Sequence, residues 1–216
     1  MTSVTLACST GSSAEPPPRL RLAGLRSRLA GPFDLSLDGG ECVAITGPSG
    51  AGKSLLLRMI ADLDPNEGEV WLDGQPRAHF TAPAWRRRVV YHAGEAGWWA
   101  ATAAAHFPAP ALAASRALAP RLGLDPALFD AAITRLSTGE RQRLALLRAL
   151  AGAPAVLLAD EPTGALDAAS TALVEALLGE RLTAGMALLV VTHNPAQAVR
   201  LGQRHLRLAE RMLGPA

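Results

Sequence analysis

A glycine-rich segment near the start of the chain carries residue types suited to phosphate chemistry. It reads Gly47-Pro48-Ser49-Gly50-Ala51-Gly52-Lys53-Ser54 and fits the pattern G-x-x-x-x-G-K-[ST]. Glycines let backbone N–H groups point inward around a phosphate, and the N-terminus of a following helix adds its positive end. Lys53, the only lysine in the chain, would then reach the β- and γ-phosphates, and the Ser54 hydroxyl would bind Mg²⁺. The alternative is a glycine-rich turn that contains Lys-Ser by coincidence.

Two acidic residues follow an apolar run in the second half of the chain. Residues 155–159 have the length and composition of a buried strand, and Asp160 and Glu161 come directly after them. Asp160 would hold Mg²⁺, directly or through water, and Glu161 would polarise an attacking water as a general base. The alternative is a strand that ends in a solvated pair of acids. Together with the glycine-rich loop, this pair predicts a nucleoside triphosphate site.

A third segment, Leu136–Arg143, opens a helix that we expect to continue to Leu150. Ser137 and Gly139 at the N-terminus of this helix would form an anion-binding nest. Equally, Ser137 would be the N-cap residue, and Glu140 three positions later would complete a capping box. The chemistry of the residues leaves both interpretations open.

Hydrophobic patterning predicts the elements that must position these residues. We expect strands near residues 20–25, 33–37, 41–46, 69–72, 89–91, 155–159 and 187–191, and helices near 54–63, 141–150 and 168–178. Residues 100–136, rich in Ala and Leu with Pro interruptions, predict short helices, and residues 1–18 predict a disordered leader. This alternation predicts an α/β fold in which helices cover a sheet.

Composition excludes several classes of protein. The chain has 216 residues, is 49% hydrophobic and carries a formal charge of +2, which predicts one globular domain and no nucleic-acid partner. Its two cysteines, Cys8 and Cys42, form neither a disulfide framework nor a zinc site by themselves. No stretch approaches the roughly 20 apolar residues of a membrane span, and the first residues lack the features of a signal peptide. We therefore expect a cytoplasmic protein.

The order of these motifs resembles the ATP-binding subunit of an ABC transporter over roughly residues 20–208. Leu136–Gln142 resembles the signature motif of that family, Ala165-Leu166-Asp167 its D-loop and His193 its switch histidine. The resemblance implies a P-loop NTPase core sheet, with a small antiparallel β subdomain and a short helical subdomain inserted at residues 94–136. Residues 19–216 would then form a single ATP-binding cassette.

The resemblance also implies an activity and partners. In that family two cassettes dimerise head to tail, and each ATP lies between the P-loop of one subunit and the signature of the other. This chain would be an ATPase that binds MgATP and powers a separate integral membrane permease from the cytoplasmic face of the inner or plasma membrane. Its catalytic residues would be Lys53, Glu161 and His193, and its Mg²⁺ ligands Ser54 and Asp160. Nucleotide-binding residues would be Gly47, Pro48, Ser49, Gly50, Ala51, Gly52, Lys53, Ser54 and Leu55, with Ser137, Thr138, Gly139 and Glu140 acting across the dimer interface.

Two departures from the family pattern lie in its motifs. The signature usually has two central glycines followed by Gln, whereas this chain has Thr138-Gly139-Glu140. The glutamine that senses Mg²⁺ and couples to the membrane partner aligns with Gly94, and the flanking His92 and Glu95 are candidate substitutes.

A third departure is the missing aromatic residue that stacks on adenine, because Ser27, between two arginines, falls near that position. These departures favour a second interpretation, a nucleotide-binding regulatory or assembly subunit with little ATP turnover. The pair Trp98-Trp99 is either part of the core or part of a groove that receives the membrane partner.

Overall fold

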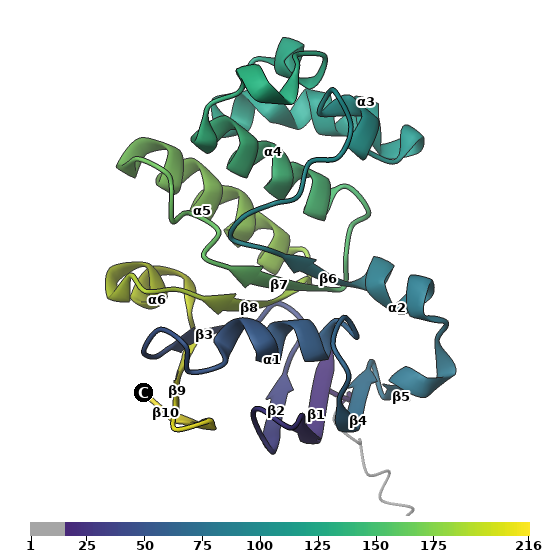
Figure 1. The fold of residues 1–216 in the computed structure, drawn as a ribbon, viewed down its shortest axis with the longest axis vertical. Coiled ribbons are helices and arrows are strands. Elements are labelled where there is room, and N and C mark those ends of the chain that lie inside the picture. Colours follow the sequence, from purple (N-terminus) through teal and green to yellow (C-terminus); the bar gives the residue numbers. More distant parts are fainter. Residues whose placement is uncertain (1–15) are drawn as a thin grey trace, which may run out of the picture.

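The structure is a computed structural model that describes residues 16–216. A six-stranded sheet with the order β10-β9-β3-β8-β7-β6 crosses the middle of the molecule (Figure 1). Five of its strands are parallel, and β10 runs antiparallel to β9. Because parallel strands end at the same edge, the loops that follow them meet there. The strands are β3 (Cys42–Thr46), β6 (Val89–His92), β7 (Val156–Asp160), β8 (Ala187–Val191), β9 (Arg204–Ala209) and β10 (Met212–Pro215).

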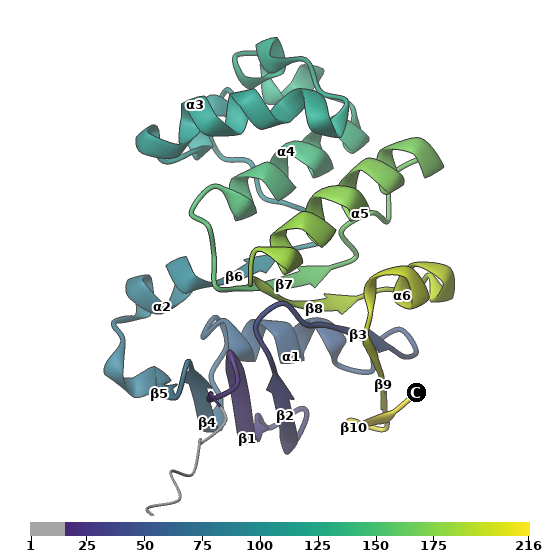
Figure 2. The same ribbon diagram turned by 180° about the vertical axis from the view of Figure 1, so that it is seen from behind.

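A second, antiparallel sheet lies beside helix α1 (Lys53–Ile60), which is placed between the two sheets (Figures 1 and 2). Strand β2 shows the alternation of a half-buried strand, with its first, third and fifth residues buried. These residues join one hydrophobic core with the apolar side chains of α1 and one face of the six-stranded sheet. The sheet consists of β2 (Phe33–Leu37), β1 (Leu20–Arg26), β4 (Glu67–Leu72) and β5 (Gln75–Pro76), in that order.

Helices cover the other face of the six-stranded sheet. The side chains of Leu157 and Ala159 enter this second core, whereas those of Val156 and Leu158 enter the first, so β7 is buried on both faces. The helices are α3 (Ala109–Leu118), α4 (Thr138–Leu150), α5 (Ala168–Thr183) and α6 (Pro195–Leu201), with α2 (Ala82–Arg88) before β6. Short 3₁₀ helices are Arg77–His79, Ala104–His106, Ala119–Leu122, Pro126–Phe129 and Ile133–Arg135.

The predicted α/β arrangement, in which helices cover a sheet, is confirmed, and each predicted strand and helix has a counterpart. Helix α4 begins at Thr138, three residues before the predicted periodic run 141–150 and directly after the candidate N-cap Ser137, and α5 continues five residues further than predicted, to Thr183. Helices α2 and α6 and the hairpin β9–β10 were not predicted. Residues 1–15 of the expected leader lie outside the described part, and residues 16–18 have no regular secondary structure. Between residues 16 and 216, no helix is long and apolar enough to cross a membrane.

Candidate functional site

The glycine-rich loop connects β3 to α1 and depends on backbone conformations that favour glycine. Gly47 has φ +148°, and a Cβ atom there would lie 2.1 Å from the carbonyl oxygen of Leu208 on β9. Gly52 has φ +100° and is the residue that precedes α1. The glycines therefore allow the loop to pass against β9 and to turn directly into the helix.

The N-terminus of α1 is open to an anion. Among residues 16–216, no side chain accepts a hydrogen bond from its first turn, and that turn contains no acidic residue. Helices α2, α4, α5 and α6 each begin with a side chain that does accept such a bond. The N–H groups and the positive dipole end of α1 are therefore left for a ligand such as phosphate.

Lys53 is buried beneath the loop that it is expected to serve. Its Nζ donates hydrogen bonds to the carbonyl oxygens of Gly47 at 2.8 Å and Pro48 at 2.9 Å. Burial lowers the pKa of the lysine, and the nearby carboxylates of Glu161 and Asp160 partly oppose this effect. The ammonium group is thus fixed across the loop and faces two acids.

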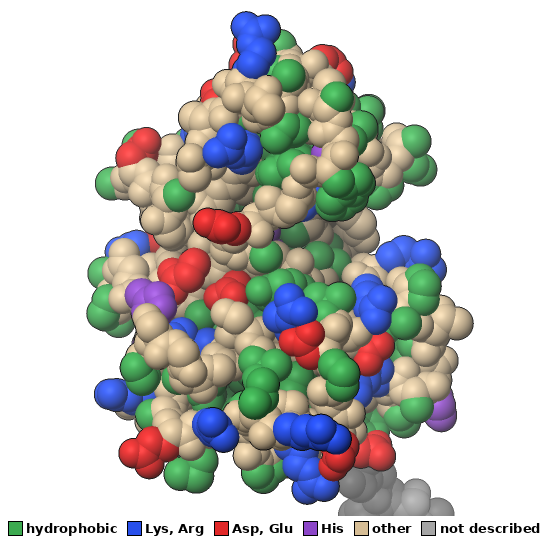
Figure 3. Space-filling view, in the orientation of Figure 1, with side chains coloured by type: hydrophobic (Ala, Val, Ile, Leu, Met, Phe, Trp, Pro, Cys, Tyr) green, Lys and Arg blue, Asp and Glu red, His purple; other side chains and the backbone are tan. Residues whose placement is uncertain are grey.

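One cavity of about 660 Å³ brings together residues from four separate segments. Figure 3 shows acidic side chains at the level where the molecule narrows between its helical upper part and the body below. The chain segments after β3, β6, β7 and β8 all contribute to the lining, as expected for the carboxyl edge of parallel strands. Among the lining residues are all five that the sequence assigned to catalysis or metal binding: Lys53, Ser54, Asp160, Glu161 and His193.

Glu161 begins the loop after β7 in a conformation that is uncommon for a residue with a side chain. Its φ is +47°, and its N–H donates to the carbonyl oxygen of Val191 on β8 at 2.9 Å. Burial raises the pKa of its carboxyl group, and the neighbouring His193 opposes this increase. His193 Nε2 lies 3.6 Å from Glu161 Oε1. The two side chains are therefore adjacent at the mouth of the cavity.

The residues present fit a magnesium ion that is bound together with phosphates. Mg²⁺ prefers oxygen ligands and commonly uses one or two protein ligands, with phosphate and water completing its shell. The Ser54 hydroxyl and the Asp160 carboxylate line the same cavity. The Glu161 side chain is partly exposed in this cavity, so its carboxylate can accept a hydrogen bond from water, whereas its Oε1 is buried without a hydrogen-bond partner within residues 16–216. In the same part of the chain, no group of three or more His, Cys, Asp or Glu side chains forms a metal site by itself.

The segment Ser137–Glu140 lies outside this cavity and forms a capping box. The hydroxyl and the N–H of Ser137 both donate to Glu140 Oε2 at 2.8 Å, and the Glu140 N–H donates back to the Ser137 hydroxyl at 3.2 Å. These bonds lower the pKa of the Glu140 carboxyl group. The capping interpretation of the sequence is therefore confirmed, and the expected contact with an anion stays a prediction.

We expect Ser137→Ala to lower the free energy of unfolding by about 1 kcal/mol, because the helix loses its N-cap acceptor. Thr138→Ala is the matched control, since its hydroxyl takes no part in the capping box, and we expect a change within about 0.5 kcal/mol. Urea denaturation of both variants without nucleotide measures the difference. Equal stabilities would contradict the capping role.

Gln142 is a positioning residue that the sequence did not reveal. Its Nε2 donates to the carbonyl oxygen of Glu161 at 2.9 Å, and its Oε1 accepts from the N–H of Ala165 at 3.1 Å. The buried amide therefore connects α4 to the loop that carries Glu161.

Asp167, from the expected D-loop, caps α5 by accepting a hydrogen bond from the Ser170 N–H at 2.7 Å.

The loop after β6 passes directly against the two acids. A Cβ atom on Gly94 would lie 3.3 Å from the carbonyl oxygen of Asp160. Of the two flanking candidates, Glu95 lines the cavity, whereas His92 is buried in the sheet and does not line it. Burial and the positive charge of Arg148 lower the pKa of His92 to about 4. His92 is therefore a core residue and is excluded as a substitute for the missing glutamine.

The two tryptophans after this loop differ in their surroundings. Trp98 is half-buried and packs against the second core, whereas Trp99 is 79% exposed. The guanidinium of Arg148 on α4 lies 4.6 Å from the ring centroid of Trp98 and 5.4 Å from that of Trp99, and it donates to the Gly97 carbonyl oxygen. Arg148 therefore fixes this loop to α4 while leaving one indole at the surface.

A second cavity, of about 1120 Å³, adjoins the first at Leu55, which lines both. It includes Ser27 and its two neighbouring arginines, and no aromatic residue of the described chain lines it. An adenine ring that entered this cavity would meet Arg26, Arg28 and Leu29 rather than an aromatic ring.

Comparisons with known proteins agree with this geometry. A family model described as ABC transporter matches residues 31–164. The lipoprotein-releasing system ATP-binding protein LolD of Anaeromyxobacter dehalogenans is 38% identical over 89% of this chain and 90% of its own. The macrolide export ATP-binding/permease protein MacB 2 of Aeromonas hydrophila is 37% identical over 76% of this chain, which spans only 28% of that protein. A dimeric post-hydrolysis structure of the ATP-binding cassette MJ0796, bound to ADP and Pi, is 26% identical with a TM-score of 0.78, over 91% of this chain and 98% of its own.

Proposed function

We propose, from the premise that this chain belongs to the ABC transporter family of ATP-binding cassettes, that it binds and hydrolyses MgATP and thereby powers a membrane permease. The observation that carries this proposal is the cavity at the open N-terminus of α1. It combines a buried cation, Lys53, with an acid pair and a histidine from two other strands.

Each residue of the cavity has a proposed role in holding the triphosphate. The backbone N–H groups of Gly47 and of residues 49–55 would surround the phosphates, and Lys53 would move from its carbonyl partners to the β- and γ-phosphate oxygens. Ser54 and Asp160 would hold Mg²⁺. When bound, that ion neutralises charge on the phosphates. Positioning and charge neutralisation supply most of the catalysis in phosphoryl transfer.

Glu161 is the proposed general base. Its side chain lines the cavity and is partly exposed, so its carboxylate would accept a proton from the attacking water, while the buried Oε1 faces His193. His193, 3.6 Å from that oxygen, would orient the carboxylate and contact the γ-phosphate. The strained backbone at Glu161 and the hydrogen bond from Gln142 to its carbonyl oxygen fix the main chain that carries this side chain at the edge of the cavity.

A second copy of the chain would complete the site. Ser137, Thr138, Gly139 and Glu140 do not line the cavity that holds Lys53, so they would contact the nucleotide of the opposite subunit in a head-to-tail homodimer. The MJ0796 cassette, which this chain resembles in fold, forms a dimer that is bound to ADP and Pi. This likeness supports the dimer proposed for the present chain.

The membrane partner would be a separate integral permease that meets this chain at the cytoplasmic face of the membrane. Trp99 supports this proposal, because an exposed indole held by Arg148 and His106 is a fixed apolar anchor. The loop that carries Trp99 includes Gly94, which lies next to the backbone of Asp160. Contact with a permease at Trp99 would therefore be transmitted to the acid pair through a short stretch of backbone.

Turnover should depend on protein concentration, because each ATP would need residues from two subunits. At concentrations below dimer formation, we expect the rate of phosphate release from MgATP to rise with about the square of protein concentration. A rate that rises linearly over a roughly hundredfold range would contradict the dimeric site. ATP binding without turnover, alone or with any permease supplied in vesicles, would favour the regulatory subunit instead, for which the glycine at position 94 is the motivating observation.

A further inference from the structure

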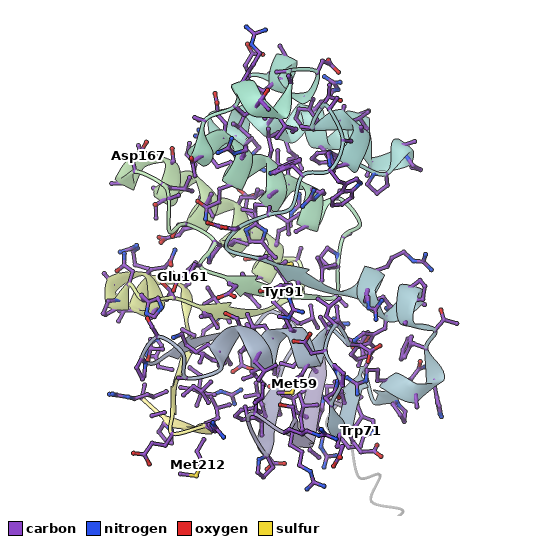
Figure 4. The ribbon with its side chains drawn as sticks, viewed as in Figure 1. Met59, Trp71, Tyr91, Glu161, Asp167 and Met212 are labelled. Carbon is purple, nitrogen blue, oxygen red and sulfur yellow. The ribbon has the colours of Figure 1, made fainter. Side chains whose placement is uncertain are left out.

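Tyr91, the only tyrosine in the sequence, lies where the first core meets the cavity of Lys53. It is the third residue of β6, and its phenol oxygen donates a hydrogen bond to Asp160 Oδ2 at 3.1 Å. Figure 4 shows Tyr91 at the level of the six-stranded sheet, close to α1. The contact joins two segments that are 69 residues apart in the chain.

The register of the sheet explains why Tyr91 reaches Asp160. Strands β6 and β7 are parallel neighbours, and Tyr91 is paired with Leu158. Side chains alternate along a strand, so Leu158 and Asp160 lie on the same face, the one that packs on α1. The ring of Tyr91 packs against that core beside Leu158, and its hydroxyl extends forward to the acid at the end of the strand.

This hydrogen bond constrains the Asp160 carboxylate. Within residues 16–216, it is the one hydrogen bond that a side chain donates to that buried group. Because the phenol occupies Oδ2, the carboxylate is held in one rotation and Oδ1 is left for another ligand. Hydrogen bonds of this kind orient metal-binding carboxylates, and their loss typically lowers metal affinity about 10- to 100-fold.

We propose that Tyr91 is a positioning residue for Mg²⁺: its hydroxyl fixes the Asp160 carboxylate in the orientation that binds the ion. The proposal rests on the proposed function, in which Asp160 is a Mg²⁺ ligand. The loop after β6 supports this proposal, because Gly94 lies next to Asp160 but has no side chain that could contact its carboxylate. In the described chain, Tyr91 is therefore the side chain through which β6 contacts this acid.

The test is the Mg²⁺ dependence of nucleotide binding in Tyr91→Phe. Binding of a fluorescent N-methylanthraniloyl derivative of ATP is titrated with MgCl₂ and compared with binding in EDTA. We expect the Mg²⁺ concentration at half-saturation to rise about tenfold, with unchanged affinity in EDTA, because only the metal-bound state uses the oriented carboxylate. An unchanged Mg²⁺ requirement overturns the role of Tyr91.

Asp160→Asn and the double variant separate positioning from packing. If the hydroxyl acts through the carboxylate, adding Tyr91→Phe to Asp160→Asn causes no further change in the Mg²⁺ concentration at half-saturation. If the double variant instead shows the sum of the two single effects on that concentration, the proposal is overturned. Phe keeps the ring in the core, and thermal unfolding verifies that the fold is retained. Wild-type binding that does not respond to Mg²⁺ contradicts the proposed function itself, whereas a wild-type response that Tyr91→Phe leaves unchanged contradicts only the role of Tyr91.

Discussion

Glu161→Gln should reduce the rate of MgATP hydrolysis by at least about 100-fold, the lower end of what a general base contributes. The substitution keeps the size of the side chain and replaces the proton-accepting oxygen pair with an amide. The Glu161 side chain lines the cavity and is partly exposed, so its carboxylate is the group that a water molecule in the cavity would meet. A glutamine amide at that place cannot act as a base at neutral pH.

The same variant should bind ATP at least as well as the wild type. Glutamine carries no charge, and the loss of a carboxylate from the cavity removes repulsion toward the triphosphate. Without turnover, the ATP-bound form accumulates, and with it the dimer in which two subunits share each nucleotide. Sedimentation velocity with ATP and Mg²⁺ should therefore show more dimer for Glu161→Gln than for the wild type.

The control is Glu69→Gln, the same chemical change at an exposed position on β4 of the antiparallel sheet. We expect wild-type turnover for this variant. If Glu161→Gln hydrolyses MgATP at the rate of Glu69→Gln, Glu161 is not the general base, and another group in the cavity must take the proton.

The phosphate loop and the acid pair were predictable because their chemistry is local. The motif spans about a dozen residues, which include a β-branched run, a set of glycines and Lys53. The strand, the loop and the start of the helix follow one another directly, so each part of the motif predicts the next. Asp160 and Glu161 likewise follow a run whose burial is evident from its composition. Likeness to solved cassettes confirms the predicted P-loop NTPase fold class, with its antiparallel and helical parts.

The contacts that link segments were not predictable in the same way. Tyr91 contacts Asp160 only because β6 lies next to β7, and periodicity indicates the face of a strand but not its neighbour. Gln142 follows a capping box, and nothing in its own position indicates that its amide bonds to the Glu161 carbonyl. Such residues depend on the order of strands and on helix packing, which is information that a single sequence does not contain.

The hairpin β9–β10 was missed for a different reason. Strand β9 alternates Arg and His with Leu and is only partly buried, so its apolar signal is weak. It nevertheless restricts the phosphate loop, because the carbonyl oxygen of Leu208 on this strand occupies the space that a side chain at residue 47 would need. The glycine was predicted from the phosphate loop, whereas one physical reason for it lies 161 residues later.

Lys53→Ala should abolish most nucleotide binding, with a fall in ATP affinity of about 100-fold or more. Hydrogen bonds to charged groups contribute roughly 1.5–3 kcal/mol each, and each 1.4 kcal/mol is a factor of ten in affinity. Lys53 is the cation at the open helix end, and its Nζ bonds only to two loop carbonyls in the described structure. Phosphate oxygens are stronger acceptors than these carbonyls, because they carry negative charge and attract the ammonium group directly.

The variant should remain folded, which separates a binding defect from a loss of structure. Alanine has the highest helix propensity, and the apolar residues of α1 that form the core are unchanged. The two carbonyl oxygens that lose their donor, Gly47 and Pro48, belong to a loop that borders the cavity, where water replaces the ammonium. Thermal unfolding without nucleotide should therefore give a midpoint close to that of the wild type.

Arg58→Gln is the control that distinguishes a specific contact from the general charge of the cavity. Arg58 lies on the same helix and lines the same cavity, but its guanidinium forms two hydrogen bonds with the Asp64 carboxylate at 2.6 and 2.7 Å. Its charge is therefore neutralised locally, and we expect its loss to change ATP affinity by less than about threefold, as for most exposed ion pairs. Equilibrium titration with ATP compares the two variants. If Lys53→Ala binds ATP as well as Arg58→Gln does, the phosphates do not lie at the N-terminus of α1, and the assignment of the glycine-rich loop is wrong.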